Sequence, residues 1–236
     1  MNDACNDVSV LGTFTESHDV PRIASWTSDF SLAKNALTFT LMWDGIPIVY
    51  AGQEQHYAGY ADPTNREATW LSGYDTEAEL YVTTTALNAV RNRVIALDSG
   101  YTTYGIAPIY NDTDTVAFRK GADGNQIISV LTNLGEGSEN TTLGLTNTGW
   151  DEGTLVVEIL SCKTGTVGDD GTLDVPMEKG LPRVYVAGQV VQGSVLCPEA
   201  SAMVATGRKK GDAVGNRAWS MVWLLSAAGV ASVIVF

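Results

Sequence analysis

Apolar runs that end abruptly in polar side chains mark the beginning of the chain. The first run covers residues 8–14 and leads directly into Glu16, His18 and Asp19, after which Pro21 prevents a ladder-donating strand from continuing. This is the pattern expected of a buried strand that delivers polar side chains to the mouth of a site. A His-Asp pair by itself is weak evidence, because many such pairs only hold a loop together.

A second run of the same kind covers residues 45–52 and leads into further polar side chains, Gln53, Glu54, Gln55 and His56. The segment between the two runs predicts a helix that Thr27 or Ser28 can cap. Its apolar positions recur at steps of three and four residues: Phe30, Ala33, Leu37 and Leu41. Strand, helix and strand in this order predict a parallel βαβ unit, in which the chemistry lies at the carboxyl ends of the strands.

The clearest helical pattern follows a polar and aromatic loop at 57–73. Thr76-Glu-Ala-Glu79 has the form of a capping box, and Arg91 and Arg93 lie near the end of the helix that favours positive charge. The apolar face again steps by three and four residues: Leu80, Thr83, Leu87, Val90, Val94 and Leu97. We expect this helix to cover the strands and assign it no chemistry.

After Ser99-Gly100 the helical spacing of apolar residues is replaced by short apolar runs separated by Gly, Asn and Asp. Asp123-Gly124 predicts a hairpin turn between the runs at 116–118 and 126–134. Further short runs follow at 141–145, 155–160, 172–175 and 183–187. This pattern predicts an antiparallel β-sandwich over residues 99–199.

The last segment, residues 200–236, has a different composition. Small residues and a basic, polar stretch precede residues 218–236, which carry no charge. An apolar helix of that length would span roughly 28 Å, close to the thickness of a bilayer core. The order of small residues, polar spacer and apolar end predicts a glycosylphosphatidylinositol (GPI) attachment signal. The alternative is a C-terminal membrane helix with a basic cytoplasmic anchor.

The composition of the chain restricts the kinds of molecule that it is expected to bind. The chain has 14 Lys and Arg against 27 Asp and Glu, a net charge of −13, so we expect no nucleic acid partner. The cysteines are Cys5, Cys162 and Cys197, and the sequons at Asn111 and Asn140 could accept N-glycans. Sequons and cysteines favour secretion although no signal peptide opens the chain, so we expect the natural N-terminus to lie upstream.

Three segments together resemble the last third of a fungal α-amylase of glycoside hydrolase family 13. They are Phe14-Thr-Glu-Ser-His-Asp19, the stretch from Asp44 to Gly59, and the stretch from Asp62 to Gly73. The likeness runs from Cys5 to Cys197. It implies that residues 1–98 are the last two βα units of a (β/α)8 TIM barrel and that the sandwich is the family's Greek-key domain. One departure is Ser17, because the family usually has Asn before the His-Asp pair.

The resemblance also implies roles for individual residues. It makes Asp19 the carboxylate that stabilises the transition state and gives His18 hydrogen bonds to hydroxyls of the reacting sugar. It places Asp62 and Arg66 at a more remote substrate-binding subsite. The other interpretation of Asp62 and Arg66 is an ion pair that shapes their loop, and the two are compatible. The family's nucleophile and acid/base lie on earlier strands, so we expect this chain alone to be inactive.

The same resemblance leads to expectations about disulfide bonds and about bound ligands. It implies a Cys162–Cys197 disulfide and leaves Cys5 to pair with a residue outside the chain. The family's calcium ligands also lie upstream, so we assign no metal and no cofactor to this chain. We expect a monomer, extracellular or at the cell surface, attached to the membrane through its C-terminal anchor.

Three functions remain open from the sequence. The first is hydrolysis of α-1,4-glucans such as starch or glycogen. The second is a GPI-anchored 4-α-glucanotransferase of the same fold that acts on cell-wall α-glucan. The third is a non-catalytic scaffold anchored to the wall or the membrane. Residues upstream of Met1 would discriminate among the three, because an intact pair of catalytic carboxylates excludes the scaffold.

Overall fold

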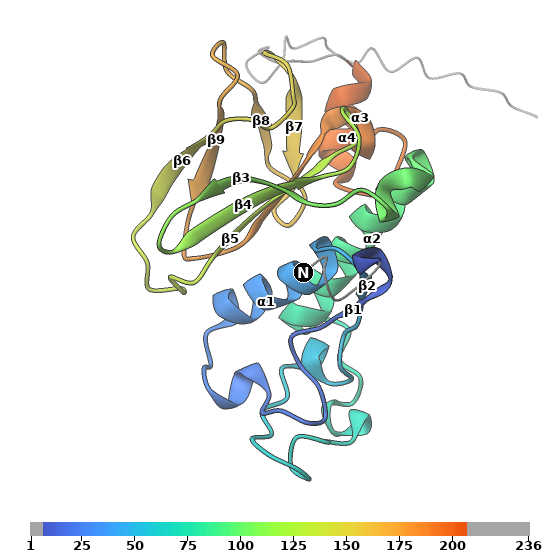
Figure 1. Cartoon of the computed structure of the whole chain (residues 1–236), viewed down its shortest axis with the longest axis vertical. Helices are drawn as coiled ribbons and strands as arrows, with labels where there is room; N and C mark the ends of the chain where they lie inside the picture. Colours follow the sequence, from blue (N-terminus) through green and yellow to red (C-terminus); the bar gives the residue numbers. More distant parts are fainter. Residues whose placement is uncertain (1–6, 207–236) are drawn as a thin grey trace, which may run out of the picture.

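The computed structural model describes residues 7–206 (Figure 1). Its first part holds the strands β1 (Gly12–Thr13) and β2 (Ile46–Pro47) and the helices α1 (Phe30–Met42) and α2 (Glu79–Leu97). Short 3-10 helices lie along the described chain: η1 (Val8–Val10), η2 (Ile23–Ser25), η3 (Gln53–Gln55), η4 (Thr69–Ser72) and η5 (Ser99–Thr102). β1 and β2 pair in parallel, with Gly12 opposite Ile46, so the expected βαβ arrangement is present.

The two parallel strands are shorter than the apolar runs that predicted them. The pair is held by hydrogen bonds from Ile46 N to Leu11 O (2.8 Å) and from Ile48 N to Thr13 O (2.9 Å). Among the described residues no third strand joins this sheet, so the ladder ends after two residues. The large apolar side chains of these runs are accordingly exposed: Val10, Leu11, Phe14, Ile46 and Ile48.

Both predicted helix caps were wrong in detail. The N-cap of α1 is Asp29, whose Oδ1 accepts from Ser31 N (2.7 Å) and Leu32 N (3.2 Å), while Thr27 Oγ1 accepts from Asp29 N instead. A carboxylate at this position both caps the first amides and meets the positive end of the helix dipole. At α2 the N-cap is Ala78, with no side-chain bond, so the predicted capping box does not form.

The predicted apolar faces are largely confirmed. The buried positions include Ala33, Leu37, Leu41, Leu80, Thr83, Leu87, Val90 and Val94. Leu97, at the last position of α2, is exposed, because the chain turns away there into η5. Arg91 is buried beside this face, and its guanidinium donates to Leu41 O (3.1 Å) and Gly45 O (3.2 Å). It therefore satisfies a carbonyl of the last turn of α1 that the helix itself leaves free.

The second part contains antiparallel strands at all six predicted runs and two further strands, at 107–111 and 164–166, that the sequence pattern did not predict. Six strands from both groups form one sheet in the order β3 (Ala107–Asn111), β4 (Thr115–Lys120), β5 (Ile127–Thr132), β10 (Arg183–Ala187), β7 (Leu155–Glu158), β8 (Thr164–Thr166). A second, two-stranded sheet pairs β6 (Thr141–Leu145) with β9 (Leu173–Met177). The helices α3 (Gly188–Val191) and α4 (Pro198–Thr206) follow. β4 and β5 pair as the Asp123-Gly124 hairpin predicted, and Gly124 has the positive φ of +85° that such a turn requires.

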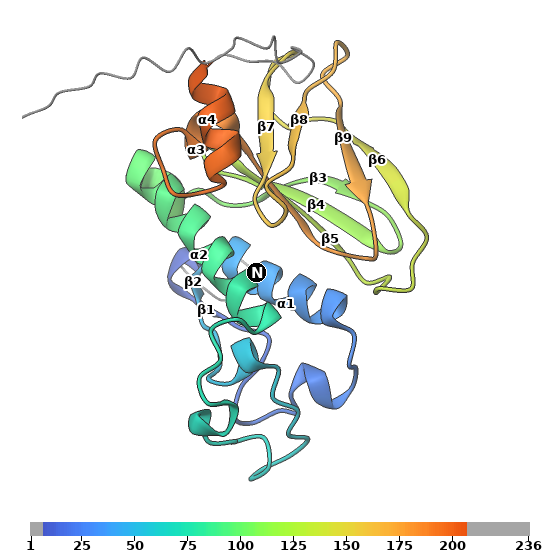
Figure 2. The same ribbon diagram turned by 180° about the vertical axis from the view of Figure 1, so that it is seen from behind.

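Side chains alternate between the two faces of the large sheet and build two cores. One face packs Ala117, Ile128, Val130, Val156 and Tyr185 with Leu145, Leu173 and Val175 of the small sheet. The other face packs Phe118, Ile127, Val157, Val184 and Val186 with Leu41, Leu87, Val90 and Val94 of α1 and α2. Figures 1 and 2 show α1 and α2 below the large sheet and α3 and α4 beside β7. The sandwich and the βαβ part thus share a core.

A buried ion pair also joins the two parts. Lys120 of β4 is buried and donates from Nζ to Asp44 Oδ1, and the same carboxylate accepts from Ile106 N (3.1 Å). Burial lowers the pKa of Lys120 below its ordinary value, although the Asp44 carboxylate opposes that shift. Asp44 O in turn accepts from Thr13 Oγ1 (2.6 Å), so the pair fixes the entry to β2 against β1 and against the sheet.

The disulfide between Cys162 and Cys197 is confirmed, with the two Cα atoms 5.2 Å apart. It ties the turn after β7 to the start of α4 and closes a loop of 35 positions. In the chain-entropy model a loop of this size contributes roughly 3–4 kcal/mol through the unfolded state.

Two other sequence predictions lie outside the described residues. One is the pairing of Cys5, and the other is the anchor signal, most of which falls in residues 207–236. Within residues 7–206 the helices are too short or too polar to cross a membrane.

We expect Asp44→Asn to lower the free energy of unfolding by about 3 kcal/mol, because it leaves the Lys120 ammonium buried without a counter-charge. Adding Lys120→Met should recover a large part of the loss, since the orphaned charge is then gone. Glu79→Gln is the matched control, because the Lys34–Glu79 pair (2.7 Å) has a largely exposed carboxylate and should cost no more than about 1 kcal/mol. Urea unfolding measures all three, and equal losses for Asp44→Asn and Glu79→Gln would contradict the prediction.

Candidate active site

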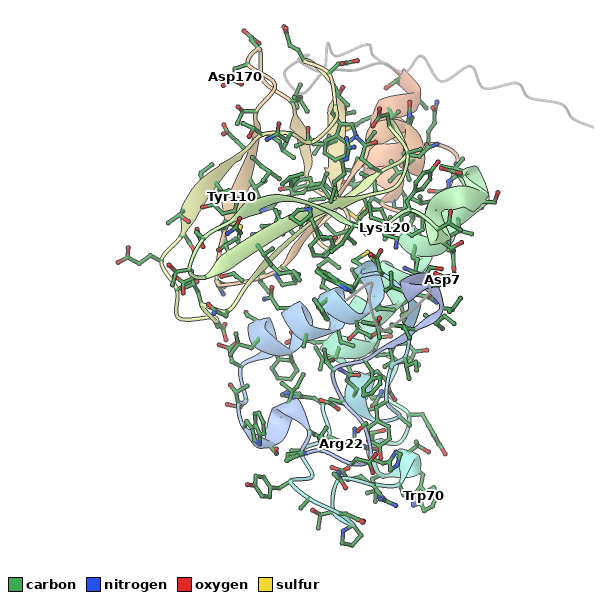
Figure 3. All side chains as sticks on the ribbon, in the orientation of Figure 1. Asp7, Arg22, Trp70, Tyr110, Lys120 and Asp170 are labelled. Carbon is green, nitrogen blue, oxygen red and sulfur yellow. A yellow bond between two sulfur atoms is a disulfide. The ribbon has the colours of Figure 1, made fainter. Side chains whose placement is uncertain are left out.

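The segments that follow β1 and β2 meet at the end of the molecule farthest from the sandwich. Figure 3 labels Arg22 and Trp70 at this end and Asp170 and Tyr110 at the other. The chain leaves the carboxyl ends of both parallel strands toward this end of the molecule, as the βαβ pattern predicted. The site therefore consists of residues 14–26 after β1 and residues 48–74 after β2.

Arg22 lies at the centre of this region and is 0% exposed. Its guanidinium donates to Glu67 Oε2 (2.7 Å), Glu16 Oε2 (3.2 Å) and Ala51 O (2.9 Å). Its carbon atom also lies 4.3 Å from the centre of the Tyr50 ring. One cation therefore joins the segment after β1, the end of the segment after β2 and the loop beyond it. We call Arg22, Glu16 and Glu67 the Arg22 cluster.

Glu16 serves this cluster and is itself buried. Its Oε1 accepts from Ile23 N (3.0 Å), while Oε2 accepts from Arg22. Burial raises the pKa of Glu16, although the Ile23 amide and the Arg22 guanidinium favour the charged form. With both oxygens held by partners, Glu16 is engaged in holding the loop rather than directed toward solvent.

Asn65 extends the cluster to the His-Asp segment. It is buried, and its Nδ2 donates to His18 O (3.0 Å) and Val20 O (2.9 Å). The backbone carbonyl of Asn65 accepts from Arg22 Nε (3.2 Å) and from the Tyr50 hydroxyl (3.1 Å). The backbone on either side of Asp19 is therefore fixed by hydrogen bonds to the loop after β2.

His18 and Asp19 are held by their backbone but reach into solvent. Their side chains are 58% and 71% exposed, and His18 Nε2 lies 3.1 Å from Asp19 Oδ1. Ser17, the departure from the family pattern, accepts from Asp19 N through its hydroxyl (3.2 Å). Ser17 thus bonds the backbone of the residue to which the resemblance gives the transition-state role.

Asp62 and Arg66 form an exposed ion pair with two contacts. Arg66 Nε lies 3.2 Å from Asp62 Oδ1, and Arg66 Nη2 donates to Asp62 Oδ2 (3.3 Å). The pair forms as the loop-shaping interpretation expects, and substrate binding by it stays a prediction. Because Asn65 directly precedes Arg66 and bonds His18 O, the structure brings both predicted pairs onto contacting segments of backbone.

Sequence reasoning missed the residues that hold the site. Arg22, Asn65 and Glu67 were not identified, because each lies in an irregular segment where no periodicity distinguishes a buried polar side chain from an exposed one. Gln53, which the sequence analysis named only as one of the polar side chains after the second run, is buried and donates to Thr15 Oγ1 (3.1 Å). The available signal was a cluster of charged residues inside an otherwise weakly charged stretch.

His56 ends η3 in the left-handed region, with a φ of +57°. Its ring lies 4.2 Å from that of Phe30, and its Nε2 is buried without a hydrogen-bond partner among the described residues. Burial lowers the pKa of His56, and the Glu79 carboxylate only partly opposes this. Burial therefore favours the neutral form of the imidazole, which packs against the Phe30 ring.

Metal and glycan predictions can be placed on the structure only in part. Residues 7–206 contain no group of three His, Cys, Asp or Glu side chains that could hold a metal ion. Asn111, at the end of β3, and Asn140, just before β6, are both exposed, as a glycan acceptor must be. Glycosylation at either residue stays a prediction.

Two family models match the chain. The model described as "Alpha amylase, catalytic domain" covers residues 1–137, and the model described as "Alpha-amylase, domain C" covers residues 108–205. The overlap at 108–137 falls on β3, β4 and β5, and β4 and β5 contribute Phe118 and Ile127 to the core shared with α1 and α2.

Similar proteins agree with these models. The chain is 46% identical over 198 residues to alpha-amylase 1 of Schwanniomyces occidentalis, which is 84% of this chain and 38% of that protein. It is 41% identical over 184 residues to the alpha-amylase of Saccharomycopsis fibuligera, covering 78% of this chain and 36% of the relative. The structure of an alpha-amylase from Malbranchea cinnamomea matches with a TM-score of 0.78 and 47% identity, over 83% of this chain and 41% of the other.

The chain thus spans well under half the length of the curated relatives that it matches. A gamma-CGTase from Alkalophilic bacillus clarkii also shares the fold, with a TM-score of 0.64 and 19% identity. Identity that low shows the fold alone and does not favour a transferase over a hydrolase.

Arg22→Lys should destabilise the fold by about 3 kcal/mol or more, because an ammonium cannot reproduce the planar fork that reaches both carboxylates and the Ala51 carbonyl. Arg66→Lys is the matched control, since it makes the same exchange in an exposed Arg–carboxylate pair of the loop after β2 and should cost less than about 1 kcal/mol. Chemical unfolding followed by circular dichroism gives both values. A loss for Arg22→Lys no larger than that of the control would show that the cluster does not hold the loops.

His56 predicts an acid-sensitive contribution to stability. Its pKa in the fold lies below the ordinary 6.5, so between these two pKa values the unfolded chain binds more protons than the folded one. Stability should therefore rise with pH through this window and be lost as pH falls below about 6.5. His56→Gln should flatten this part of the melting temperature profile between about pH 5 and 7.5. An unchanged slope in His56→Gln would contradict the assignment.

Proposed function

The chain belongs to the α-amylase family, and from this premise we propose that it forms part of an enzyme that hydrolyses α-1,4-glucans such as starch or glycogen. The observation that carries the proposal is the exposed His18–Asp19 pair, whose backbone is held by Asn65 at the carboxyl end of β1. A functional carboxylate needs this combination of a fixed backbone and an accessible side chain.

Asp19 acts in this proposal as the carboxylate that stabilises the transition state. Hydrolysis of a glycosidic bond passes through an oxocarbenium-like state in which positive charge develops on the sugar ring. A fixed carboxylate beside that ring attracts the developing charge more strongly than it attracts the neutral ground state, so it lowers the barrier. His18, 3.1 Å from Asp19, orients the carboxylate and hydrogen-bonds hydroxyls of the same sugar.

Asp62 and Arg66 bind a neighbouring part of the glucan. Their mutual contacts at 3.2 and 3.3 Å orient both groups, while their exposure leaves a carboxylate lone pair and guanidinium donors for sugar hydroxyls. The shape of the loop and the recognition of the sugar are thus compatible roles of one pair.

We assign neither the nucleophile nor the acid/base to this chain. A retaining glycosidase needs two carboxyl groups about 5–5.5 Å apart that face the scissile bond. Glu16 and Glu67 are close neighbours of the site, but both are held by Arg22. We therefore propose that the catalytic pair comes from other parts of the enzyme and that this chain alone does not hydrolyse glucan. Calcium would likewise be held elsewhere.

The proposed location is outside the cell. The disulfide fits an oxidising compartment, and the charge-free residues 218–236 are the basis for proposing a GPI anchor at the cell surface. The hydrolase is preferred to the transferase and to the scaffold, because relatives at 46% and 41% identity are named alpha-amylases, whereas the gamma-CGTase that shares the fold is 19% identical.

A chimera tests the proposal. The segment of this chain that aligns with alpha-amylase 1 of Schwanniomyces occidentalis replaces its counterpart in that enzyme, and soluble starch is the substrate. We expect the chimera to hydrolyse starch and Asp19→Asn to lower its kcat by about 10²–10³-fold with a smaller change in KM. Asp123→Asn, which changes an exposed carboxylate of the sandwich, should stay within about twofold.

Two results would contradict the proposal. Parental kcat in the Asp19→Asn chimera would remove Asp19 from the mechanism. Starch hydrolysis by this chain alone, above the uncatalysed background, would show that the catalytic pair is not supplied from elsewhere.

A further inference from the structure

Tyr60 is an aromatic residue to which neither the Arg22 cluster nor the proposed catalytic and binding residues assign a role. It is 64% exposed and lies two positions before Asp62, in the loop that follows β2. Its hydroxyl makes no hydrogen bond to any of the described residues, although buried or half-buried tyrosines nearby, such as Tyr50 and Tyr57, bond backbone groups. An exposed tyrosine without an internal partner offers a ligand both an apolar ring face and a free hydroxyl.

The backbone under Tyr60 is fixed by the Arg22 cluster. Gly59 N donates to Glu67 Oε1 (2.6 Å), and Gly59 O accepts from Arg22 N (3.1 Å). A Cβ at Gly59 would come within 2.0 Å of Thr64 O, so the two limbs of the loop touch at this glycine. The residues between them, 60–64, form a closed tip that stands on the buried cluster.

Hydrogen bonds within the loop close the tip as a turn. Thr64 Oγ1 donates to Ala61 O (2.6 Å), and Asn65 N donates to the same carbonyl (3.0 Å), which closes the turn internally. All five residues of the tip are exposed, and the Asp62–Arg66 pair lies directly beside it. The ring, a carboxylate and a guanidinium are therefore presented to solvent from one rigid turn.

We propose that Tyr60 is a stacking platform for a glucose ring of an α-glucan chain whose neighbouring hydroxyls bind Asp62 and Arg66. The inference rests on the proposed function and adds a binding residue to it. A pyranose offers an apolar C–H face and a rim of hydroxyls, so an aromatic ring beside a polar pair matches both parts of the sugar. Tyr60 binds substrate in this role and takes no part in bond cleavage.

Tyr74 provides a matched control. It is 63% exposed, almost the same as Tyr60, and follows η4 in the same long loop. Its backbone is also fixed, because Tyr74 N donates to Ser72 Oγ (3.2 Å) and Ser72 N donates to the Tyr57 hydroxyl (3.0 Å). Tyr74 lies outside the closed tip that carries Asp62, so a general effect of exposed tyrosines would appear in both variants.

The experiment measures binding of maltoheptaose to the full chain by titration calorimetry, with circular dichroism to verify the fold of each variant. Tyr60→Ala should weaken binding by about threefold to tenfold, which is the range expected for losing one aromatic contact. Tyr60→Phe keeps the ring and should stay within about twofold of the parent, as should Tyr74→Ala. Asp62→Asn should also weaken binding, because it removes the polar part of the same subsite.

Each other result overturns the inference. Unchanged affinity in Tyr60→Ala, or equal losses in Tyr60→Ala and Tyr74→Ala, would remove Tyr60 from the binding site while leaving the proposed function intact. No binding by the parent chain would also overturn it. The proposed function would then be judged separately by the starch hydrolysis of the chimera and its dependence on Asp19, neither of which uses Tyr60.

Discussion

The candidate site depends on burying the charge of Arg22 among the loops that follow β1 and β2. A guanidinium removed from water is stable only if carboxylates and carbonyls replace its hydration, and here Glu16, Glu67 and the Ala51 carbonyl do so. These groups come from three separate segments, so satisfying one cation fixes all three at once. The loops that carry His18, Asp19, Asp62 and Arg66 therefore need no regular secondary structure to hold a defined shape.

A second buried cation connects this end of the molecule to the sandwich. Lys120 of β4 meets Asp44, two positions before β2, and Arg91 of α2 donates to the carbonyl of Gly45, which lies between them. β2 then leads to Ala51, whose carbonyl is bound by Arg22. Polar contacts of buried cations thus hold both ends of the segment that contains β2, with Lys120 and Arg91 at its start and Arg22 at its end, alongside the apolar core that α1 and α2 share with the sheet. The sandwich braces the strand that ends at the site.

Charged residues in this region divide into two groups by their exposure. Arg22 and Glu16 are buried and hold backbone, whereas His18, Asp19, Asp62 and Arg66 are exposed and bonded mainly within their own pairs. The buried group accounts for the rigidity of the loops, and the exposed group is left with free donors and acceptors. Recognition of a neutral sugar needs this arrangement, because hydroxyls are bound by groups that are oriented in advance rather than by net charge.

Local pattern in the sequence was sufficient for α1, α2, the parallel βαβ unit and six of the antiparallel strands, because periodicity reports which face of each element is buried; β3 and β8 were missed. Local pattern also singled out His18 and Asp19, and the resemblance supplied the predicted roles of these residues and of Asp62 and Arg66, together with the Cys162–Cys197 bridge. The caps, the length of β1 and β2, the exposure of Leu97, and the roles of Arg22, Asn65 and Lys120 were decided only by the tertiary structure. Each of these depends on partners far away in the chain, such as Glu67, 45 positions after Arg22, and Asp44, 76 positions before Lys120. The sequence does not show whether a charged side chain is solvated by water or paired with a carboxylate from a distant segment. Only the tertiary structure determines which of the two surrounds it.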